Sequence, residues 1–341
     1  MTESAMYPCN QAFSNQPGPV SVWLFRFVLL LSLTLAGCAS KPVAVVAPDT
    51  QSAVKAAAAE PPAPRAPPRI ALALGGGAAR GFAHIGVIKA LEAQGIVPDI
   101  VVGTSAGSLV GALYASGLSG FDLQRVALGM DDSAITDWSL PSRGVIKGEA
   151  LQNFVNSAVG NRPIEKLPRL LGVVATNLQT GEALVFRTGN TGMAVRASSS
   201  VPGVFQPVSI SGKEYVDGGL VAPVPVRIAR SLGADIVIAV DISARPREQK
   251  TLSSFEVLLQ TFAIMGQSLV AAELPLADIV IQPKVSNIAG TDFQSRHLAV
   301  LEGERAAQEQ IPKLRARLTA LGVAGFAPLH STALGAAPVV R

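Results

Sequence analysis

The sequence predicts an α/β domain in which a mostly parallel central sheet is covered by helices on both faces. Three observations support this fold class. Short, continuous apolar runs recur along the chain, segments with apolar residues at helical spacing lie between them, and several runs end in glycine-rich loops. Apolar runs without alternation are typical of strands that are buried on both faces, as the strands of parallel sheets are.

Two strand and helix pairs follow one another at the start of the predicted domain. Ile70–Leu74 is an apolar run that ends in glycines, and residues 81–94 carry apolar side chains at helical spacing. Residues 99–102 predict a second strand and residues 105–116 a second helix. The same criteria predict later strands at 170–176, 183–186, 235–240 and 278–282, and helices near 191–198, 224–232, 252–272 and 296–320.

In open parallel sheets, binding and catalytic sites form beyond the carboxyl ends of the strands. This rule directs attention to three loops, which follow Leu74, follow Val102 and surround Val216. All three contain glycine next to polar residues. We therefore expect the chemistry of this domain in these loops.

The loop after the second strand has the pattern of a nucleophile elbow. Gly103-Thr104-Ser105-Ala106-Gly107 stands between a predicted strand and a predicted helix, the context that a G-x-S-x-G motif requires. Residues on either side of the serine must be small because the turn is tight, and the following helix N-terminus stabilises negative charge. Ser105 is the candidate nucleophile; a glycine–serine turn without chemistry is the alternative.

The loop after the first strand is the second candidate. It reads GGGAARG and contains Gly75, Gly76, Gly77, Ala78 and Arg80. Consecutive glycines leave backbone N–H groups exposed in a tight loop, and such a nest can hold an oxyanion or a phosphate. Arg80 is either a partner for an anionic headgroup or a brace of the loop.

A dinucleotide site is the rival interpretation of this glycine loop. Its fingerprint requires a glycine three residues after the second glycine, and counted from Gly75 that position is Arg80. The acid that binds the ribose should end the second strand, whereas Asp99 begins it. Both departures disfavour a nucleotide-binding protein.

The third loop places an acid before two glycines. It reads Tyr215-Val216-Asp217-Gly218-Gly219, and glycine permits sharp backbone turns. Taken alone, this segment favours an ordinary turn, because Asp-Gly is a common turn signal. Asp217 becomes a candidate functional acid only in combination with the other two loops.

No histidine is well placed to serve as the base of a catalytic triad. A triad of the α/β-hydrolase type requires a histidine near the C-terminal end of the domain. His297 begins a predicted helix, and His330 lies in a tail rich in Ala, Gly and Pro. His84 lies one turn into the first helix and is expected to be packed or to act as a cap. The serine therefore needs another base.

Taken together, the motifs resemble the patatin-like phospholipase family. The resemblance is carried, in order and spacing, by the glycine loop with Arg80-Gly81, the elbow at 103–107 and Asp217-Gly218-Gly219. Further segments similar to the small bacterial members are 175–178, 196–203 and 233–241. The similarity is close over residues 69–242 and looser to residue 320.

The resemblance implies a patatin-like three-layer α/β/α sandwich and a Ser–Asp dyad without histidine. Ser105 would be the nucleophile and Asp217 the proton acceptor. The oxyanion hole would be formed by backbone amides around Gly76, Gly77 and Ala78, with Arg80 nearby. Many members carry glycine where this chain has Ala78, so the choice of donating amides stays open. The implied reaction is hydrolysis of carboxylic esters of membrane lipids, of phospholipase A or lysophospholipase type, with no cofactor and no metal.

The N-terminus is predicted to be a targeting segment. Residues 27–36 have the length of the apolar region of a signal peptide and are too short to span a bilayer. Residues 35–38 (LAGC) resemble a bacterial lipobox, in which the chain is cut before Cys38 and the cysteine is acylated. By the same resemblance, Ala39 implies the outer membrane. We expect a lipid-anchored protein of the bacterial cell envelope that faces the periplasm.

The predicted organisation has four parts: a signal peptide with lipobox at 1–37, a Pro/Ala-rich tether at 38–68, a catalytic domain at 69–320 with its core motifs at 70–241, and a weakly ordered tail at 321–341. Residues 118–168 are the place to look for a segment that covers the substrate.

Composition limits the partners. The net charge of +4 fits loose contact with an anionic membrane, and no basic stripe indicates nucleic-acid binding. Cys9 and Cys38 both precede the predicted domain, which excludes a disulfide framework. The expected partners are the lipid substrate and the membrane, without an obligate protein partner. A non-catalytic lipid-binding lipoprotein is the alternative of another class.

Overall fold

A computed structural model describes residues 67–130, 146–246, 251 and 254–322, all within one compact unit that spans 64–341. The predicted signal peptide, Cys38, His330 and nearly all of the predicted tether and tail lie outside the described residues. No helix among the described residues has both the length and the apolar character needed to cross a bilayer.

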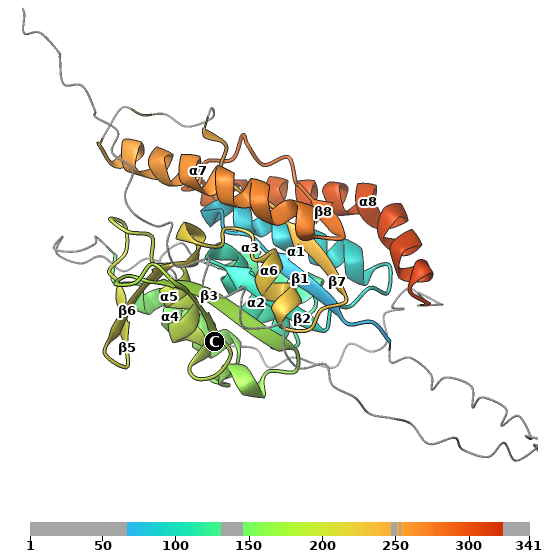
Figure 1. The fold of residues 1–341 in the computed structure, drawn as a ribbon, viewed down its shortest axis with the longest axis horizontal. Coiled ribbons are helices and arrows are strands. Elements are labelled where there is room, and N and C mark those ends of the chain that lie inside the picture. Colours follow the sequence, from blue (N-terminus) through green and yellow to red (C-terminus); the bar gives the residue numbers. More distant parts are fainter. Residues whose placement is uncertain (1–66, 131–145, 247–250, 252–253, 323–341) are drawn as a thin grey trace, which may run out of the picture. The chain divides into compact units, whose positions relative to one another are not determined.

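The described strands form one eight-stranded sheet (Figure 1). Its parallel part consists, in spatial order, of β8 (Ile279–Ile281), β7 (Ile236–Val240), β1 (Ile70–Leu74), β2 (Ile100–Thr104) and β3 (Leu170–Asn177). The antiparallel part consists of β4 (Ala183–Phe186) and β6 (Lys213–Asp217), which both pair with β3, and β5 (Val208–Ile210), which pairs with β6. The prediction of a mostly parallel sheet is therefore confirmed.

Helices cover both faces of this sheet, because successive side chains of a strand point to opposite sides. On one face, Leu72 and Leu74 belong to the core that includes α1 (Phe82–Glu92), α2 (Ala106–Ala115) and α8 (Arg296–Ala320). On the other face, Ala71 and Ala73 belong to a second core, which includes α6 (Val226–Ser231) and Val270 of α7 (Ser254–Glu273). Figure 1 shows α6 in front of β1, with α1 behind it. The predicted three-layer α/β/α arrangement is confirmed.

The three central strands, which were predicted as continuous apolar runs, are buried along their whole length. Each residue of β1, β2 and β7 is buried, so these strands expose neither face to water. The predicted helix near 191–198 forms as α5 (Thr191–Ser198), and the predicted helix at 296–320 forms over the same residues.

Among the described residues, two α-helices and two strands were not predicted from the sequence: α3 (Gly120–Gly129), α4 (Glu149–Ala158), β5 and β6. The first two lie within residues 118–168, the stretch named above as the place to look for a substrate-covering segment; residues 131–145 of that stretch lie outside the described residues. The third functional loop was expected around Val216, but the structure places Val216 inside β6, which ends at Asp217. The sequence did not reveal β5 and β6 because both strands are short and only a tight turn separates them.

Candidate active site

Ser105 lies at the turn between β2 and α2 and has the backbone conformation of a strained elbow. Its φ is 54° and its ψ is −124°, a region that residues with a side chain rarely adopt. Such a conformation costs about 1–3 kcal/mol, so the surrounding structure must enforce it. Part of that constraint is a hydrogen bond of 2.9 Å from the Ser105 backbone N–H to Oγ of Ser198.

The two glycines of the elbow are required by close backbone contacts. A Cβ atom on Gly103 would lie 2.3 Å from the carbonyl oxygen of Gly107. A Cβ atom on Gly107 would lie 2.2 Å from the carbonyl oxygen of Leu74, at the end of the neighbouring strand. The small residues that the motif demands therefore let α2 begin directly against β1 and β2.

The strand register explains how Asp217 reaches Ser105. On β3, Val174 pairs with Thr104, the last residue of β2, and the next residue, Ala175, pairs with Asp217 of β6. The opposite side of β3 is occupied by β4 at both positions. Thr104 and Asp217 therefore lie on the same side of β3, one residue or about 3.3 Å apart along it. Asp217 occupies the position that β2 would reach if the chain did not turn away at the elbow. Strands β2 and β6 thus meet end to end at Ser105 and Asp217.

The Asp217 side chain is buried and bonded. It is 6% exposed, and its Oδ1 accepts a hydrogen bond of 2.7 Å from the backbone N–H of Gly219. Its backbone is held by a bond of 2.9 Å from its N–H to the Ser200 carbonyl and by a bond of 2.8 Å from Thr176 Oγ1 to its own carbonyl.

Burial raises the pKa of Asp217 from 3.8 to about 6, and hydrogen bonds from the Ser105 hydroxyl and the Gly219 N–H partly oppose this rise. The Ser105 side chain therefore lies close enough to Asp217 to lower the pKa of its carboxyl, as expected of a group that faces its general base. A carboxylate with a pKa near 6 is still ionised at neutral pH, yet it is a far stronger base than an exposed aspartate.

The glycine loop touches the nucleophile, and its backbone hydrogen bonds distinguish the amides. A Cβ on Gly76 would lie 3.3 Å from Cβ of Ser105. The N–H of Gly75 donates to Val240 and that of Gly76 to Pro223, at 3.0 and 2.9 Å. Within the described part of the chain, the N–H groups of Gly77 and Ala78 donate to no protein acceptor. Of the three amides expected to form the oxyanion hole, those of Gly76, Gly77 and Ala78, the Gly76 amide is thus already bonded, and the other two have no acceptor among the described residues.

Ala78 adopts a left-handed conformation with a φ of 51°. This accounts physically for the glycine that many family members were expected to carry here, because glycine enters this region without a steric cost. The following residues are fixed from the C-terminal part of the domain. The Ala79 N–H donates to Gly290 at 3.0 Å, and Nε of the buried Arg80 donates to the Ile288 carbonyl at 2.9 Å. These contacts support the brace interpretation of Arg80.

His84 holds the first residue of the same glycine loop through a hydrogen bond. It is fully buried, and its Nε2 lies 2.8 Å from the carbonyl oxygen of Gly75. A carbonyl only accepts, so Nε2 carries the proton. Burial lowers the pKa of His84 to about 4, so the ring is neutral at physiological pH. The expectation of a packed histidine is confirmed. His297 is exposed on the first turn of α8.

Comparison with known proteins places the site in a defined family. A family model described as patatin-like phospholipase matches residues 72–230. This segment contains the glycine loop, the elbow and Asp217. Residues 72–230 therefore form a patatin-like phospholipase domain. Strands β7 and β8 and helices α7 and α8 lie outside the matched segment.

Several curated proteins are similar to this chain. An uncharacterised NTE family protein of Mycobacterium bovis is 38% identical over 183 residues, which cover 52% of this chain and 49% of the relative. Another, from Mycobacterium tuberculosis, is 30% identical over 268 residues, covering 70% of this chain and 46% of the relative. Patatin-like phospholipase domain-containing protein 6 of Mus musculus is 34% identical over 227 residues, covering 64% of this chain and 16% of the relative. The chain thus spans about half the length of the first two relatives.

Solved structures with a similar course of the chain include VipD from Legionella pneumophila, with a TM-score of 0.49 and 16% identity over 74% of this chain and 67% of that one. They also include the type III effector ExoU, with a TM-score of 0.42 and 14% identity over 74% of this chain and 54% of that one.

Sequence reasoning about this patatin-like domain missed three supporting residues. Ser198 accepts the Ser105 N–H, the Ser200 carbonyl accepts the Asp217 N–H, and Thr176 donates to the Asp217 carbonyl. The segments 175–178 and 196–203 did contribute to the family resemblance, but their contacts depend on the fold. No group of three metal-binding side chains gathers among the described residues.

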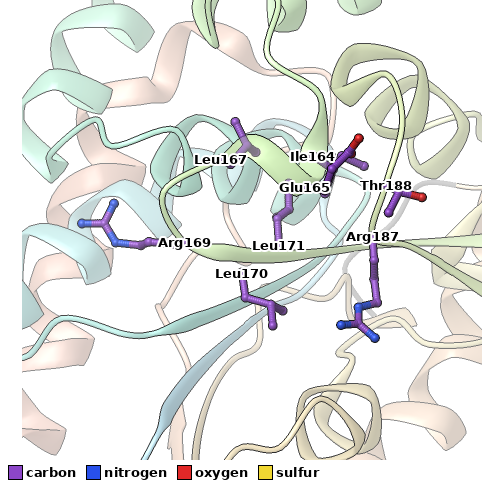
Figure 2. A pocket seen from close by; sticks show the side chains of 8 residues that line it. All are labelled: Ile164, Glu165, Leu167, Arg169, Leu170, Leu171, Arg187 and Thr188. Atoms are coloured by element: carbon purple, nitrogen blue, oxygen red, sulfur yellow. The ribbon is translucent and has the colours of Figure 1, made fainter.

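A cavity of about 430 Å³ lies at the other end of β3 (Figure 2). Its wall includes Arg169, Leu170 and Leu171, at the start of the strand, whereas Ala175 pairs with Asp217 near its end. Figure 2 shows Arg169 and Arg187 on opposite sides, with their guanidinium groups directed away from one another. Arg169 is engaged with Tyr114, whose carbonyl it contacts at 2.7 Å. This cavity is separate from the candidate active site.

Proposed function

We propose that the chain hydrolyses carboxylic ester bonds of membrane lipids, with Ser105 as the nucleophile and Asp217 as the general base. One observation supports this most strongly. The end-to-end meeting of β2 and β6 brings a buried carboxylate with a pKa near 6 next to the elbow serine. The match of residues 72–230 to the patatin-like phospholipase model points to the same chemistry.

The first half of the reaction forms an acyl-enzyme. Asp217 accepts the hydroxyl proton of Ser105 as Oγ attacks the ester carbonyl carbon, and the carbonyl oxygen becomes an oxyanion. The N–H groups of Gly77 and Ala78 are the available donors for that oxyanion. When the tetrahedral intermediate collapses, the C–O bond to the alcohol breaks, and the proton on Asp217 passes to the leaving alkoxide.

The second half regenerates the enzyme. Asp217 accepts a proton from water, the hydroxide attacks the acyl carbon, and a second oxyanion forms in the same place. The bond to Oγ then breaks, Ser105 regains its proton, and the fatty acid leaves. General-base assistance typically contributes about 10²–10⁴ in rate and one oxyanion donor about 10²–10³. In this mechanism, burial of Asp217 raises its pKa and so makes the carboxylate a better general base.

Labelling with a fluorophosphonate probe tests this proposal. We expect wild type to be labelled and to hydrolyse lipid esters. Ser105→Ala should lose both properties, and Asp217→Asn should lose hydrolysis. Hydrolysis that persists in Ser105→Ala would eliminate the dyad. An unreactive serine in the wild type would favour the non-catalytic lipid-binding alternative. A screen of phospholipids, lysophospholipids and simple esters then identifies the substrate class.

We also propose that the protein is anchored in the bacterial envelope through Cys38, with residues 38–68 as its tether. The support is the sequence pattern of residues 27–38 alone. Metabolic labelling with palmitate, followed by membrane fractionation, tests it. Cys38→Ser should abolish the label, and a labelled Cys38→Ser protein would refute the anchor.

A further inference from the structure

Helix α7 presents an apolar face to solvent. Between Glu256 and Glu273 the sequence contains no charged residue. Four large apolar side chains on this helix are substantially exposed: Val257 (50%), Leu258 (37%), Ile264 (53%) and Met265 (55%). The last three follow Val257 by one, seven and eight residues, which places all four on a single face, since seven residues make nearly two helical turns. The exposed hydroxyl residues Thr261 and Ser268 share this face.

The opposite face of α7 fixes this orientation. Val270 is buried in the core that α6 and one face of the sheet form. At the helix end, the Glu273 carboxylate accepts hydrogen bonds of 2.8 Å from the Arg227 N–H and 2.7 Å from Arg227 Nε. Near the helix start, the Gln260 amide donates to the Pro246 carbonyl. The apolar face therefore points outward because the other face is already engaged.

The exposed face lies beside the candidate active site. Helix α7 packs against Gly218–Leu220, which directly follow Asp217. A Cβ atom on Gly203 would lie 3.1 Å from a methyl carbon of Leu258. Gly203 belongs to the loop that begins with Ser200, whose carbonyl holds the Asp217 backbone.

We propose that this face of α7, around Val257, Leu258, Ile264 and Met265, inserts into the surface of a lipid bilayer and presents the dyad to lipid esters. This inference rests on the proposed function and names how that site meets its substrate. Apolar side chains on one face of a helix can bind a membrane by entering the boundary between headgroups and acyl chains. A second copy of the chain fits less well, because four partly exposed side chains cover far less than the roughly 800 Å² per partner that a stable interface buries.

The insertion can be measured locally, without interference from the predicted lipid anchor. The full chain carries only Cys9 and Cys38, so Cys9→Ser and Cys38→Ser leave a background for one new cysteine. An environment-sensitive fluorophore is attached at Ile264→Cys or, as a matched control, at Leu301→Cys. Leu301 is 42% exposed on α8, which packs against the other face of the sheet. Ser105→Ala is added so that no lipid is cleaved.

Phosphatidylcholine vesicles should shift the emission of the label at position 264 to the blue and leave the label at 301 unchanged. Because the face carries no charge, the shift should persist at high salt. A label at 264 that does not respond to vesicles would overturn the proposal. A label at 264 that is already shielded at high protein concentration without vesicles would also overturn it, in favour of contact between two copies.

Activity provides the second measurement. Replacing Ile264 and Met265 together with Gln should lower the ratio of vesicle-lipid hydrolysis to soluble short-chain ester hydrolysis by about tenfold or more, because two buried apolar side chains are lost from the lipid phase. Leu298→Gln with Leu301→Gln, at two exposed positions of α8, should leave that ratio within about twofold. An unchanged ratio in the α7 variant would contradict the proposal. If the wild type hydrolyses neither the vesicle lipid nor the soluble ester, that result contradicts the proposed function, and the fluorescence measurement still tests the insertion.

Discussion

Asp217→Asn should abolish ester hydrolysis and, at neutral pH, make the protein more stable. Asn has the same shape, and its side-chain oxygen can still accept the Gly219 N–H, but it carries no charge. In the wild type, burial raises the Asp217 pKa from 3.8 to about 6, so the folded state holds its proton more tightly than the unfolded state does. Stability from this group is therefore complete below pH 3.8 and is lost as pH rises through 6.

The size of the effect follows from that shift. The pKa of Asp217 differs by roughly two units between the folded and unfolded states. At pH 7.5 this difference lowers the free energy of unfolding by about 3 kcal/mol relative to low pH. At pH 4.5, where some of the unfolded carboxyl is still protonated, it lowers the free energy of unfolding by about 1 kcal/mol. Asp217→Asn should therefore raise the free energy of unfolding by up to about 3 kcal/mol at pH 7.5, with the gain shrinking toward pH 4.

Urea denaturation of wild type and Asp217→Asn at pH 4.5 and 7.5, followed by circular dichroism, measures this difference. Asp122→Asn is the control of opposite sign, because Asp122 completes a capping box at α3, and hydrogen bonding to Ser119 lowers the pKa of Asp122. That control should lose stability at pH 7.5. If Asp217→Asn is no more stable than wild type at pH 7.5, or if its gain is equally large near pH 4, the assigned burial of a charged base is wrong.

Three further predictions concern the same site. The kcat/KM for a soluble ester should rise with pH through an apparent pKa near 6, since Asp217 must be ionised to accept a proton; a pH-independent profile between 5 and 7 would exclude this role. His84→Gln should lower thermal stability and leave that pKa unchanged, because the neutral ring supports Gly75 and takes no proton; a displaced pKa would make His84 a participant. Gly107→Ala should destabilise the fold by about 3 kcal/mol or more, because the new methyl group meets the Leu74 carbonyl at 2.2 Å; urea denaturation within about 1 kcal/mol of wild type would contradict that contact.

The sequence predicted most of the regular elements because their signals are local. Continuous apolar runs located β1, β2 and β7, and helical spacing located α1 and α8 with nearly their observed bounds. Helices α3 and α4 were not predicted, although each carries a local signal of helix formation. Helix α3 begins with a capping box of Ser119 and Asp122, and α4 buries Leu151 and Val155, which are four residues apart.

The candidate site divides in the same way. The strand–turn–helix context of Ser105 is contained in a few neighbouring residues, so the amino-acid sequence alone is enough to recognise the elbow. The glycines on either side also follow from the tightness of that turn, and the fold adds the atoms that a side chain there would meet. Asp217 could be associated with Ser105 only through resemblance to a family, because a lone Asp-Gly-Gly segment also fits an ordinary turn.

Tertiary structure decided what depends on distant contacts. It determined that β6 meets the end of β2 and so placed Asp217 beside Ser105, because the register of strand pairing is fixed by long-range packing. It also determined that the Gly76 N–H donates to the Pro223 carbonyl, whereas the N–H groups of Gly77 and Ala78 have no acceptor among the described residues. Local periodicity gives each segment its secondary structure and an apolar face, but only packing determines which faces are covered. The sequence determined that α7 is uncharged along most of its length, and the fold alone turned one face of it toward solvent beside the dyad.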